Sequence, residues 1–316
     1  MPLLEIGMVL GGLVLLFVGA EGLVKGASAM ALRLGITPII VGLTVIAFGT
    51  SAPELLVGLI GTDDVAVGNI LGSNVANLAL ILGAAALVHP IEVKHRAVRH
   101  DLPIMIGVTV LFILLAINGS LSQLNGGILL GTLVAYLGYT YYEARRDALS
   151  VEDVIGEELD DEEEATKRSP WGNLAFILGG IIGLALGAKW MVDGSIAIAQ
   201  MIGVSELVIG ISVVALGTSL PELATSMSAA RHGETDLTVG NVIGSNIFNL
   251  LLVLGVVSSV GAVTVDPQAL AIDLWVVLGL SVLIWPLLRS DHCLDRKEGV
   301  FLLVVYAVYV ITLFIR

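Results

Sequence analysis

Two stretches of the chain, TVIAFGTSAPE at residues 44–54 and SVVALGTSLPE at residues 212–222, are close copies of one another. They lie 168 residues apart. A second pair, GNILGSNVANL at 68–78 and GNVIGSNIFNL at 240–250, follows at a spacing of 172 residues. Four pairs of glycines keep the first spacing: Gly19 and Gly187, Gly26 and Gly194, Gly35 and Gly203, and Gly42 and Gly210. Because chance similarity between apolar segments does not produce several matches in the same order, the chain contains an internal duplication.

The composition places both copies in a membrane. Of the 316 residues, 56% are hydrophobic and only 14% are charged, and the mean hydropathy is +0.97. A membrane-spanning helix takes about 20 mostly apolar residues, so the apolar content is enough for roughly ten such helices. The single cysteine excludes an intramolecular disulfide, and the net charge of −13 argues against nucleic acid as a partner. We predict an all-α polytopic membrane protein.

Ten apolar segments lie along the chain, and a polar stretch divides them into five and five. The predicted helices cover residues 6–27, 36–60, 66–88, 101–118, 127–142, 172–195, 204–230, 237–262, 269–288 and 298–315. The polar stretch carries nine acidic side chains between residues 152 and 164 and lacks the Asp/Gly spacing of an EF-hand, so we interpret it as a solvated linker. The predicted parts are a first five-helix repeat at 1–142 with its motif region at 42–82, an acidic linker at 143–170, and a second five-helix repeat at 171–316 with its motif region at 210–254.

The odd number of helices in each repeat determines how the copies are related in the membrane. After five spans the chain is on the other side, so the second copy has inverted topology, which is typical of carriers with a substrate site near the bilayer midplane. If the N-terminus is outside, thirteen of the fifteen Lys and Arg residues lie in or beside inside connections, and only Lys189 and Arg316 do not. The positive-inside rule therefore predicts that both termini are outside and that the acidic linker is cytoplasmic.

Polar residues inside the predicted spans gather at the repeated motifs. Thr50, Ser51 and Glu54 are spaced so that they share one face of the second helix. Pro53 cannot donate a backbone hydrogen bond to the carbonyl of residue 49, and carbonyl groups freed at membrane depth can bind a cation. The seventh helix carries the same residue types: Thr218, Ser219, Pro221 and Glu222. Pairs of residues four apart in the third and eighth helices complete the set: Ser73 with Asn77, and Ser245 with Asn249.

The chemistry of these side chains favours a hard cation. All of them offer oxygen, as Ca²⁺ prefers with its six to eight ligands, whereas zinc and copper sites use nitrogen or sulfur. None of the five histidines lies in the motifs, and we expect them in loops or at interfaces. Glu54 and Glu222 are functional candidates because ionisable groups inside a membrane are costly. The neighbouring Asn74 and Asn246 are less favoured as ligands.

Charged pairs outside the motifs have a simpler interpretation. Glu21 and Lys25 are four residues apart, as are their repeat mates Lys189 and Asp193 with the signs exchanged. We predict that both pairs are salt bridges near helix ends and assign none of these residues to the cation site.

The two motif pairs resemble the alpha-repeats of the calcium/cation antiporter superfamily, specifically its prokaryotic sodium/calcium exchangers. GTSAPE at 49–54 and GTSLPE at 217–222, each followed by its Gly-Asn-rich partner, carry a resemblance that extends over nearly the whole chain. It implies ten helices in two inverted repeats, an outside N-terminus and a four-subsite cation centre between helices 2, 3, 7 and 8. The ligands that it implies are the side chains of Thr50, Ser51, Glu54, Ser73, Asn77, Thr218, Ser219, Glu222, Ser245 and Asn249, and the backbone carbonyls of Ala47 and Ala215.

The chain departs from its relatives at two places. Some archaeal and potassium-dependent members carry Asp where this chain has Asn249, which disfavours dependence on K⁺. The first repeat is also four residues shorter than the second in the connection after its glutamate, LIGTDDVAVGN. Its outer loop therefore differs from that of longer relatives.

The function predicted from these observations is secondary active antiport of Na⁺ against Ca²⁺ by alternating access, with electrogenic Ca²⁺ extrusion driven by Na⁺ influx. A Ca²⁺/H⁺ antiporter in which Glu54 and Glu222 titrate is the alternative within the same fold. A cation channel is a different class, but the sequence has neither a ring of acids nor a pore loop. An enzyme is disfavoured because no His or Cys base accompanies a serine. We expect no cofactor, no nucleic acid and no obligatory protein partner; Na⁺, Ca²⁺ and the lipid bilayer are the expected partners.

Overall fold

The computed structural model describes residues 3–34, 36–93, 97–151, 169–201, 215–267, 269–289 and 292–315. The first repeat contains α1 (Leu3–Leu34), α2 (Pro38–Val41), η1 (Gly42–Ile46), α3 (Ala47–Thr50), α4 (Ala52–Ile60), α5 (Asp63–Val75), η2 (Ala76–Ile81), α6 (Leu82–Val88), β1 (Ile91–Glu92), η3 (Ala97–Asp101), α7 (Leu102–Ala116), β2 (Ser120–Leu121) and α8 (Gln123–Val151), where η marks a π-helical turn. The second repeat contains α10 (Pro170–Met201), α12 (Ala215–Thr218), α13 (Leu220–Arg231), α14 (Thr235–Phe248), η5 (Asn249–Val253), α15 (Leu254–Val260), β3 (Val263–Thr264), η6 (Ala269–Asp273), α16 (Leu274–Arg289), β4 (Cys293–Leu294) and α17 (Arg296–Ile315).

The helices coincide with the predicted spans. Within the described ranges, seven helices are long and apolar enough to cross a membrane, and α8, α17 and the α12–α13 segment lie at the other three predicted positions. Residues 204–214 of the seventh predicted span and the acidic run 152–164 lie outside the described residues. Several helices run past the predicted ends, most clearly α1 and α8, because the predictions marked only the apolar stretch and a helix can continue beyond the bilayer.

Irregular elements repeat with the spacing seen in the sequence. The π-helical turns η3 and η6 begin at residues 97 and 269, and the strands β1 and β3 begin at residues 91 and 263. Both pairs are 172 residues apart, as are the Gly-Asn-rich motifs. The duplication therefore preserved interruptions of the helices as well as the helices themselves.

Two short ribbons of strands link the repeats and require that they be inverted. β1 pairs antiparallel with β4, and β2 pairs antiparallel with β3. Paired strands lie about 5 Å apart, so they cannot be on opposite sides of a hydrocarbon layer about 30 Å thick. Only the inverted arrangement puts β1 with β4 on one side and β2 with β3 on the other, since two repeats of the same orientation would separate both pairs.

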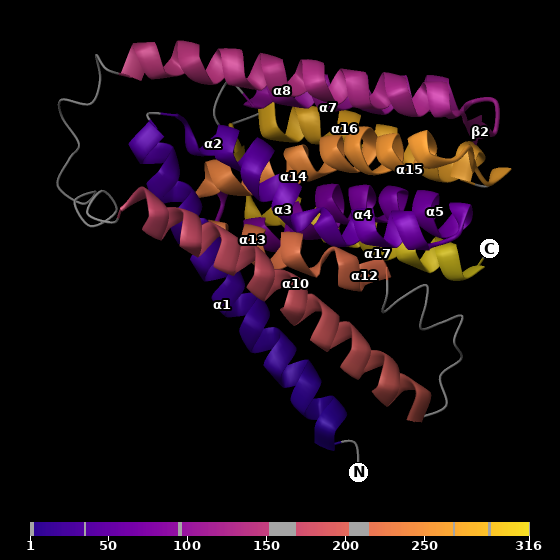
Figure 1. The fold of residues 1–316 in the computed structure, drawn as a ribbon, viewed down its shortest axis with the longest axis horizontal. Coiled ribbons are helices and arrows are strands. Elements are labelled where there is room, and N and C mark those ends of the chain that lie inside the picture. The colour runs from indigo at the N-terminus through magenta and orange to yellow at the C-terminus, as the bar shows by residue number, and fades with distance from the viewer. Residues whose placement is uncertain are drawn as a thin grey trace.

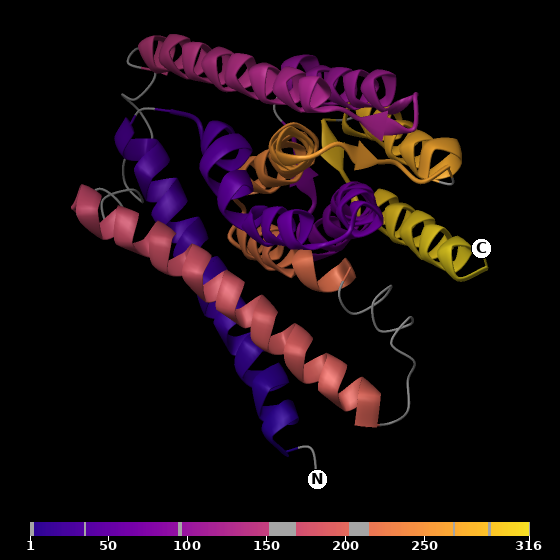
Figure 2. The same ribbon diagram turned by 45° about the vertical axis from the view of Figure 1, so that its right-hand side comes forward.

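Equivalent helices of the two repeats pack against one another. α1 and α10 form a pair that lies obliquely against the rest of the bundle (Figure 1 and Figure 2). This pair needs glycine at its crossing, because a Cβ on Gly12 would lie 2.7 Å from the carbonyl oxygen of Gly187. α7 packs on its mate α16 in the same way, whereas α8 packs on α15 and α17 on α6, two contacts that are equivalent to one another. The interior of the bundle is formed by the broken second span together with α5, η2, α14 and η5, whose residues are mostly buried.

Candidate cation-binding site

Both motif helices are interrupted at a serine. Ser51 separates α3 from α4 with φ −81° and ψ 6°, and Ser219 separates α12 from α13 with φ −87° and ψ 3°. Thr50, Ser51 and Glu54 all face the interior, as their spacing predicted, although the chain starts a new helix after the serine. Pro53 is at the beginning of that helix, where its missing N–H leaves no helical hydrogen bond unmade.

The interruption has an electrostatic consequence for the two glutamates. Glu54 lies in the first turn of α4, and Glu222 lies in the first turn of α13. The N-terminus of a helix carries unpaired N–H groups and the positive end of the helix dipole, which stabilise a carboxylate. The same break that divides each helix thus makes a buried negative charge less costly.

The structure brings all ten predicted side-chain ligands into the interior of the bundle. None of them is more than 7% exposed, and Glu54, Thr50, Ser245 and Asn249 are completely buried. They come from the broken second span, from α5 and η2, from α12 and α13, and from α14 and η5. These elements cross near the centre of the molecule (Figure 1).

Hydrogen bonds connect the two motif regions into one cluster. Ser51 Oγ donates to Glu222 Oε1 at 3.4 Å, which joins the first repeat to the second. Ser73 Oγ donates to Glu54 Oε1 at 3.3 Å, and Ser219 Oγ donates to Ser73 Oγ at 3.1 Å. The site therefore belongs to both repeats together.

Several oxygen atoms of the predicted ligands have no hydrogen-bond partner in the described part of the chain. They include Glu54 Oε2, Glu222 Oε2, Asn77 Oδ1 and Asn249 Oδ1. A buried polar atom without a partner is costly, and a native protein normally satisfies it with water, an ion or another group. Two carboxylate and two amide oxygens of this kind form a ligand set that suits a hard cation such as Na⁺ or Ca²⁺.

Sequence reasoning missed a pair of asparagines that hold the threonines. Thr50 Oγ1 donates to Asn241 Oδ1 at 3.3 Å, and its repeat mate Thr218 Oγ1 donates to Asn69 Oδ1 at 3.0 Å. Asn69 precedes Ser73 by four residues on the same helix face. That spacing, applied to the quoted motifs, would have found both asparagines.

Asn74, which the sequence disfavours as a ligand, holds the side chain of the predicted ligand Asn249. Asn249 Nδ2 donates to Asn74 Oδ1 at 3.1 Å, and Asn74 Nδ2 donates to the carbonyl oxygen of Asn246 at 3.4 Å. Because the amide nitrogen of Asn249 is occupied in this way, its Oδ1 is the atom left for a cation.

The two predicted backbone ligands differ in their surroundings. The carbonyl oxygen of Ala47 accepts the Ser51 N–H at 3.0 Å and the Thr50 hydroxyl at 3.4 Å. In the second repeat the Ser219 N–H donates to Leu216 at 3.2 Å, one residue later than Ala215. The turn at Ser219 is tighter, so the N–H of Ser219 does not occupy the carbonyl of Ala215.

The remaining predicted features also have clear positions. Both salt bridges are confirmed, with Lys25 Nζ 3.4 Å from Glu21 Oε2 and Lys189 Nζ 2.8 Å from Asp193 Oδ2. Their predicted place near helix ends was wrong, because α1 continues to Leu34 and α10 to Met201. The four described histidines lie at or near helix ends, outside the motifs: His89, His100, His232 and His292. His95 lies outside the described residues. One contact was not foreseen: His232 Nε2 lies 3.4 Å from Glu21 Oε2 and so links α13 to α1.

Two inverted five-helix repeats around a buried, oxygen-lined centre define a cation carrier of the membrane, and comparison with known proteins gives its family. The sodium/calcium exchanger protein family matches residues 4–142 and 172–315. The chain belongs to this family, which is one of transporters and not of enzymes.

Individual relatives extend over nearly the whole chain. The inner membrane protein YrbG of Escherichia coli is 36% identical over 291 residues, covering 89% of this chain and 87% of that protein. The sodium/calcium exchanger MaX1 of Methanosarcina acetivorans is 32% identical over 337 residues, covering 96% of each. A structure of the sodium-calcium exchanger NCX_Mj, soaked with zero Na⁺ and Ca²⁺, matches with a TM-score of 0.84 at 28% identity over 99% of this chain and 100% of that one. These matches confirm the predicted ten-span fold of an integral multi-pass membrane protein.

Proposed function

We propose that this protein exchanges Na⁺ for Ca²⁺ by alternating access and uses Na⁺ influx to expel Ca²⁺. The observation that carries the proposal is the pair Glu54 and Glu222. They come from inverted repeats, are buried, and each keeps one carboxylate oxygen without a hydrogen-bond partner among the described residues. The ligands in this proposal are the side chains of Thr50, Ser51, Glu54, Ser73, Asn77, Thr218, Ser219, Glu222, Ser245 and Asn249 with the carbonyls of Ala47 and Ala215.

The charge of the site supports an electrogenic cycle. With both glutamates ionised and Asn77 and Asn249 neutral, the centre carries −2. One Ca²⁺ neutralises this charge, whereas three Na⁺ leave +1. An exchange of three Na⁺ for one Ca²⁺ then moves one net positive charge, which couples transport to the membrane potential by about 2.3 kcal/mol per 100 mV.

Unequal packing of the repeats supports alternating access. α1 packs against α13 near the end at Arg231, where Ser228 Oγ donates to Glu21 Oε1 at 3.2 Å. Within the described ranges, no comparable packing joins the repeat mates α10 and α4. Two inverted repeats in different conformations allow access from one side, and exchange of their conformations opens the other. In the proposed topology the contact between α1 and α13 lies on the cytoplasmic side, so the protein is closed on that side.

The orientation itself is part of the proposal. We place both termini outside and the acidic linker in the cytoplasm, from the distribution of Lys and Arg. A cysteine in place of Asp160, in a Cys293→Ser background, should resist impermeant thiol reagents added to intact cells. Labelling as fast as that of an external control cysteine would overturn this orientation.

The direct test of function is ⁴⁵Ca²⁺ uptake into Na⁺-loaded proteoliposomes. We expect uptake that requires the outward Na⁺ gradient and that increases when the vesicle interior is made positive by an imposed potential, since net positive charge leaves with Na⁺. Uptake driven by a proton gradient, with no effect of Na⁺, would instead establish the Ca²⁺/H⁺ alternative with the same two glutamates as proton carriers.

A further inference from the structure

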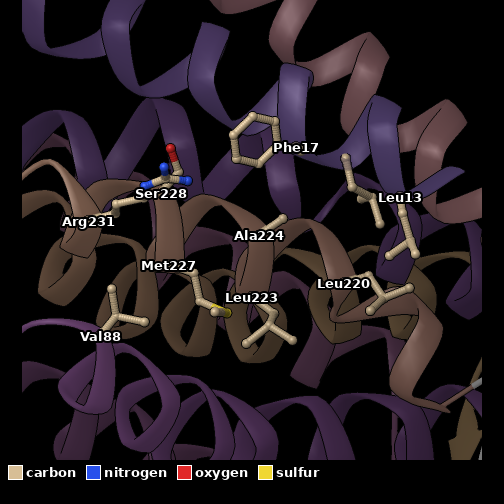
Figure 3. Close-up of a pocket in the computed structure, with 10 residues that line it drawn as sticks. Leu13, Phe17, Val88, Leu220, Leu223, Ala224, Met227, Ser228 and Arg231 are labelled. Carbon is tan, nitrogen blue, oxygen red and sulfur yellow. The ribbon is translucent and has the colours of Figure 1, made fainter. Parts of the chain in front are cut away.

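A hollow between α1 and α13 is separate from the cation site. Its volume is about 350 Å³. Figure 3 shows Leu13 and Phe17 on the α1 side, and Leu220, Leu223 and Met227 on the α13 side. Phe17 is 53% exposed and Met227 is 37% exposed, so the hollow opens on the outer surface of the bundle. In a membrane this surface faces hydrocarbon.

Both walls of the hollow change from apolar to charged in the same direction. On α13, Leu220, Leu223 and Met227 are followed one turn later by Arg231, the last residue of the helix. On α1, Leu13 and Phe17 are followed at four-residue steps by Glu21 and Lys25. The two helices therefore form one groove that is apolar at one end and ionic at the other.

The length of the groove matches one leaflet of a bilayer. From Leu220 to Arg231 the helix advances about 16 Å, at about 1.5 Å per residue. Half of a hydrocarbon core about 30 Å thick is about 15 Å. If Arg231 lies at the level of the headgroups, Leu220 lies near the midplane, at the depth expected for Ser219 beside it.

The ionic end carries two cations, Lys25 and Arg231, and two acids, Glu21 and Glu234, and the second acid accepts a hydrogen bond from Ser28 of α1 at 3.1 Å. Arg231 forms no ion pair with any acid in the described part of the chain, and its guanidinium lies 5.7 Å from the centre of the Phe17 ring. Glu21, the acid on the opposite wall, is already held by Lys25 at 3.4 Å and by the Ser228 hydroxyl at 3.2 Å. Arg231 is thus placed to bind a further anion, and guanidinium groups suit phosphate.

We propose that the hollow binds an anionic phospholipid from the leaflet at which α13 ends. An acyl chain lies between Leu13, Phe17, Leu220 and Leu223, and the headgroup phosphate binds Arg231. The lipid then lies between α1 and α13, whose packing differs from that of their repeat mates α10 and α4. Its acyl chain packs beside α13, the helix that carries Glu222.

Native mass spectrometry of the purified full-length protein with phosphatidylglycerol and phosphatidylcholine tests this proposal without reference to transport. We expect wild type to retain phosphatidylglycerol in preference to phosphatidylcholine. Arg231→Gln should lower that retention about tenfold, the loss expected for a charge-assisted hydrogen bond. Ala224 of α13 also lines the hollow (Figure 3). Ala224→Phe, which places a ring there with no change of charge, should lower the retention of both lipids. Excess inorganic phosphate should not displace the lipid, because the acyl chain provides most of the contact.

Arg296→Gln serves as the matched control, since Arg296 is an exposed arginine at the end of another helix and does not line the hollow. Size exclusion should give the same profile for every variant. Equal losses for Arg231→Gln and Arg296→Gln would show a general charge effect and overturn the proposal. Full retention of phosphatidylglycerol by a folded Ala224→Phe variant would overturn it as well.

Discussion

The two halves of the candidate site contain the same residue types but hold their glutamates differently. Glu54 accepts a hydrogen bond from Ser73 of its own repeat at 3.3 Å. Glu222 accepts one from Ser51 of the other repeat at 3.4 Å, while Ser245, the mate of Ser73, lies 3.4 Å from the hydroxyl of Thr50 instead. The difference shows that duplicated sequence does not impose symmetric bonding. A carrier that alternates between two states requires such a difference, because identical halves could not favour access from one side.

The largest expected effect comes from removing either negative charge. Glu54→Gln and Glu222→Gln should each lower initial ⁴⁵Ca²⁺ uptake more than about 100-fold, because loss of one partner from a buried charged cluster costs about 3–5 kcal/mol. Both variants leave −1 for a divalent ion. Equal losses would show that the different hydrogen bonds of the two glutamates do not change their importance.

The control for this measurement is Glu92→Gln, the same chemical change at an exposed carboxylate in β1. Its uptake should equal that of wild type at matched protein levels, with folding checked by size exclusion. Near-normal uptake by either buried variant would mean that the two-carboxylate centre is misassigned.

A smaller effect should distinguish the serines of the two repeats. Ser73→Ala removes a hydrogen bond to a charged group, which contributes about 1.5–3 kcal/mol, so uptake should fall at least about tenfold. Ser245→Ala removes a contact with a neutral hydroxyl, so the loss should be about two- to tenfold. The Ca²⁺ dependence of uptake measures both. If Ser245→Ala is the more damaging variant, the two hydrogen-bond patterns do not describe the state that binds Ca²⁺.

Asn241 and Asn69, which accept hydrogen bonds from Thr50 and Thr218, should differ in how much each contributes to the stability of the protein. Asn241 is completely buried and donates to Ser226 Oγ at 2.9 Å and to the Glu222 carbonyl at 3.3 Å. Asn69 is only half-buried. Asn241→Ala should therefore lower the free energy of unfolding by about 1–3 kcal/mol and Asn69→Ala by less. Thermal unfolding in detergent measures this order, and the reverse order would contradict it.

Much of this architecture could be predicted from the sequence because the duplication and the apolar segments are both long-range patterns. The helix positions and the convergence of Glu54 with Glu222 follow from those patterns. The β1–β4 ribbon could not be predicted, since two-residue strands have no periodicity and depend on a partner far along the chain. The sequence predicted a weakened turn at each proline but not the end of one helix and the start of another at Ser51 and Ser219, because a proline does not determine where a helix ends. The contact between Glu21 and His232 depends on tertiary packing alone.

The smallest expected effect concerns K⁺ and the amides that keep the two halves equal in charge. Asn77 and Asn249 are repeat mates, and both keep Oδ1 without a partner in the described part of the chain. A third carboxylate at position 249 would give the centre −3, and a further monovalent cation would then be needed to balance the same Ca²⁺. Because this chain has Asn249, removing K⁺ from both sides should change Na⁺-dependent ⁴⁵Ca²⁺ uptake less than about twofold, a change within the size of one weak contact. Asn249→Asp makes the charges of the two halves of the site unequal and serves as the comparison. Asn77→Asp makes the same change in the other repeat and is its matched control. If uptake by the wild-type protein stops when K⁺ is removed, charge balance at position 249 does not determine which cations this carrier uses.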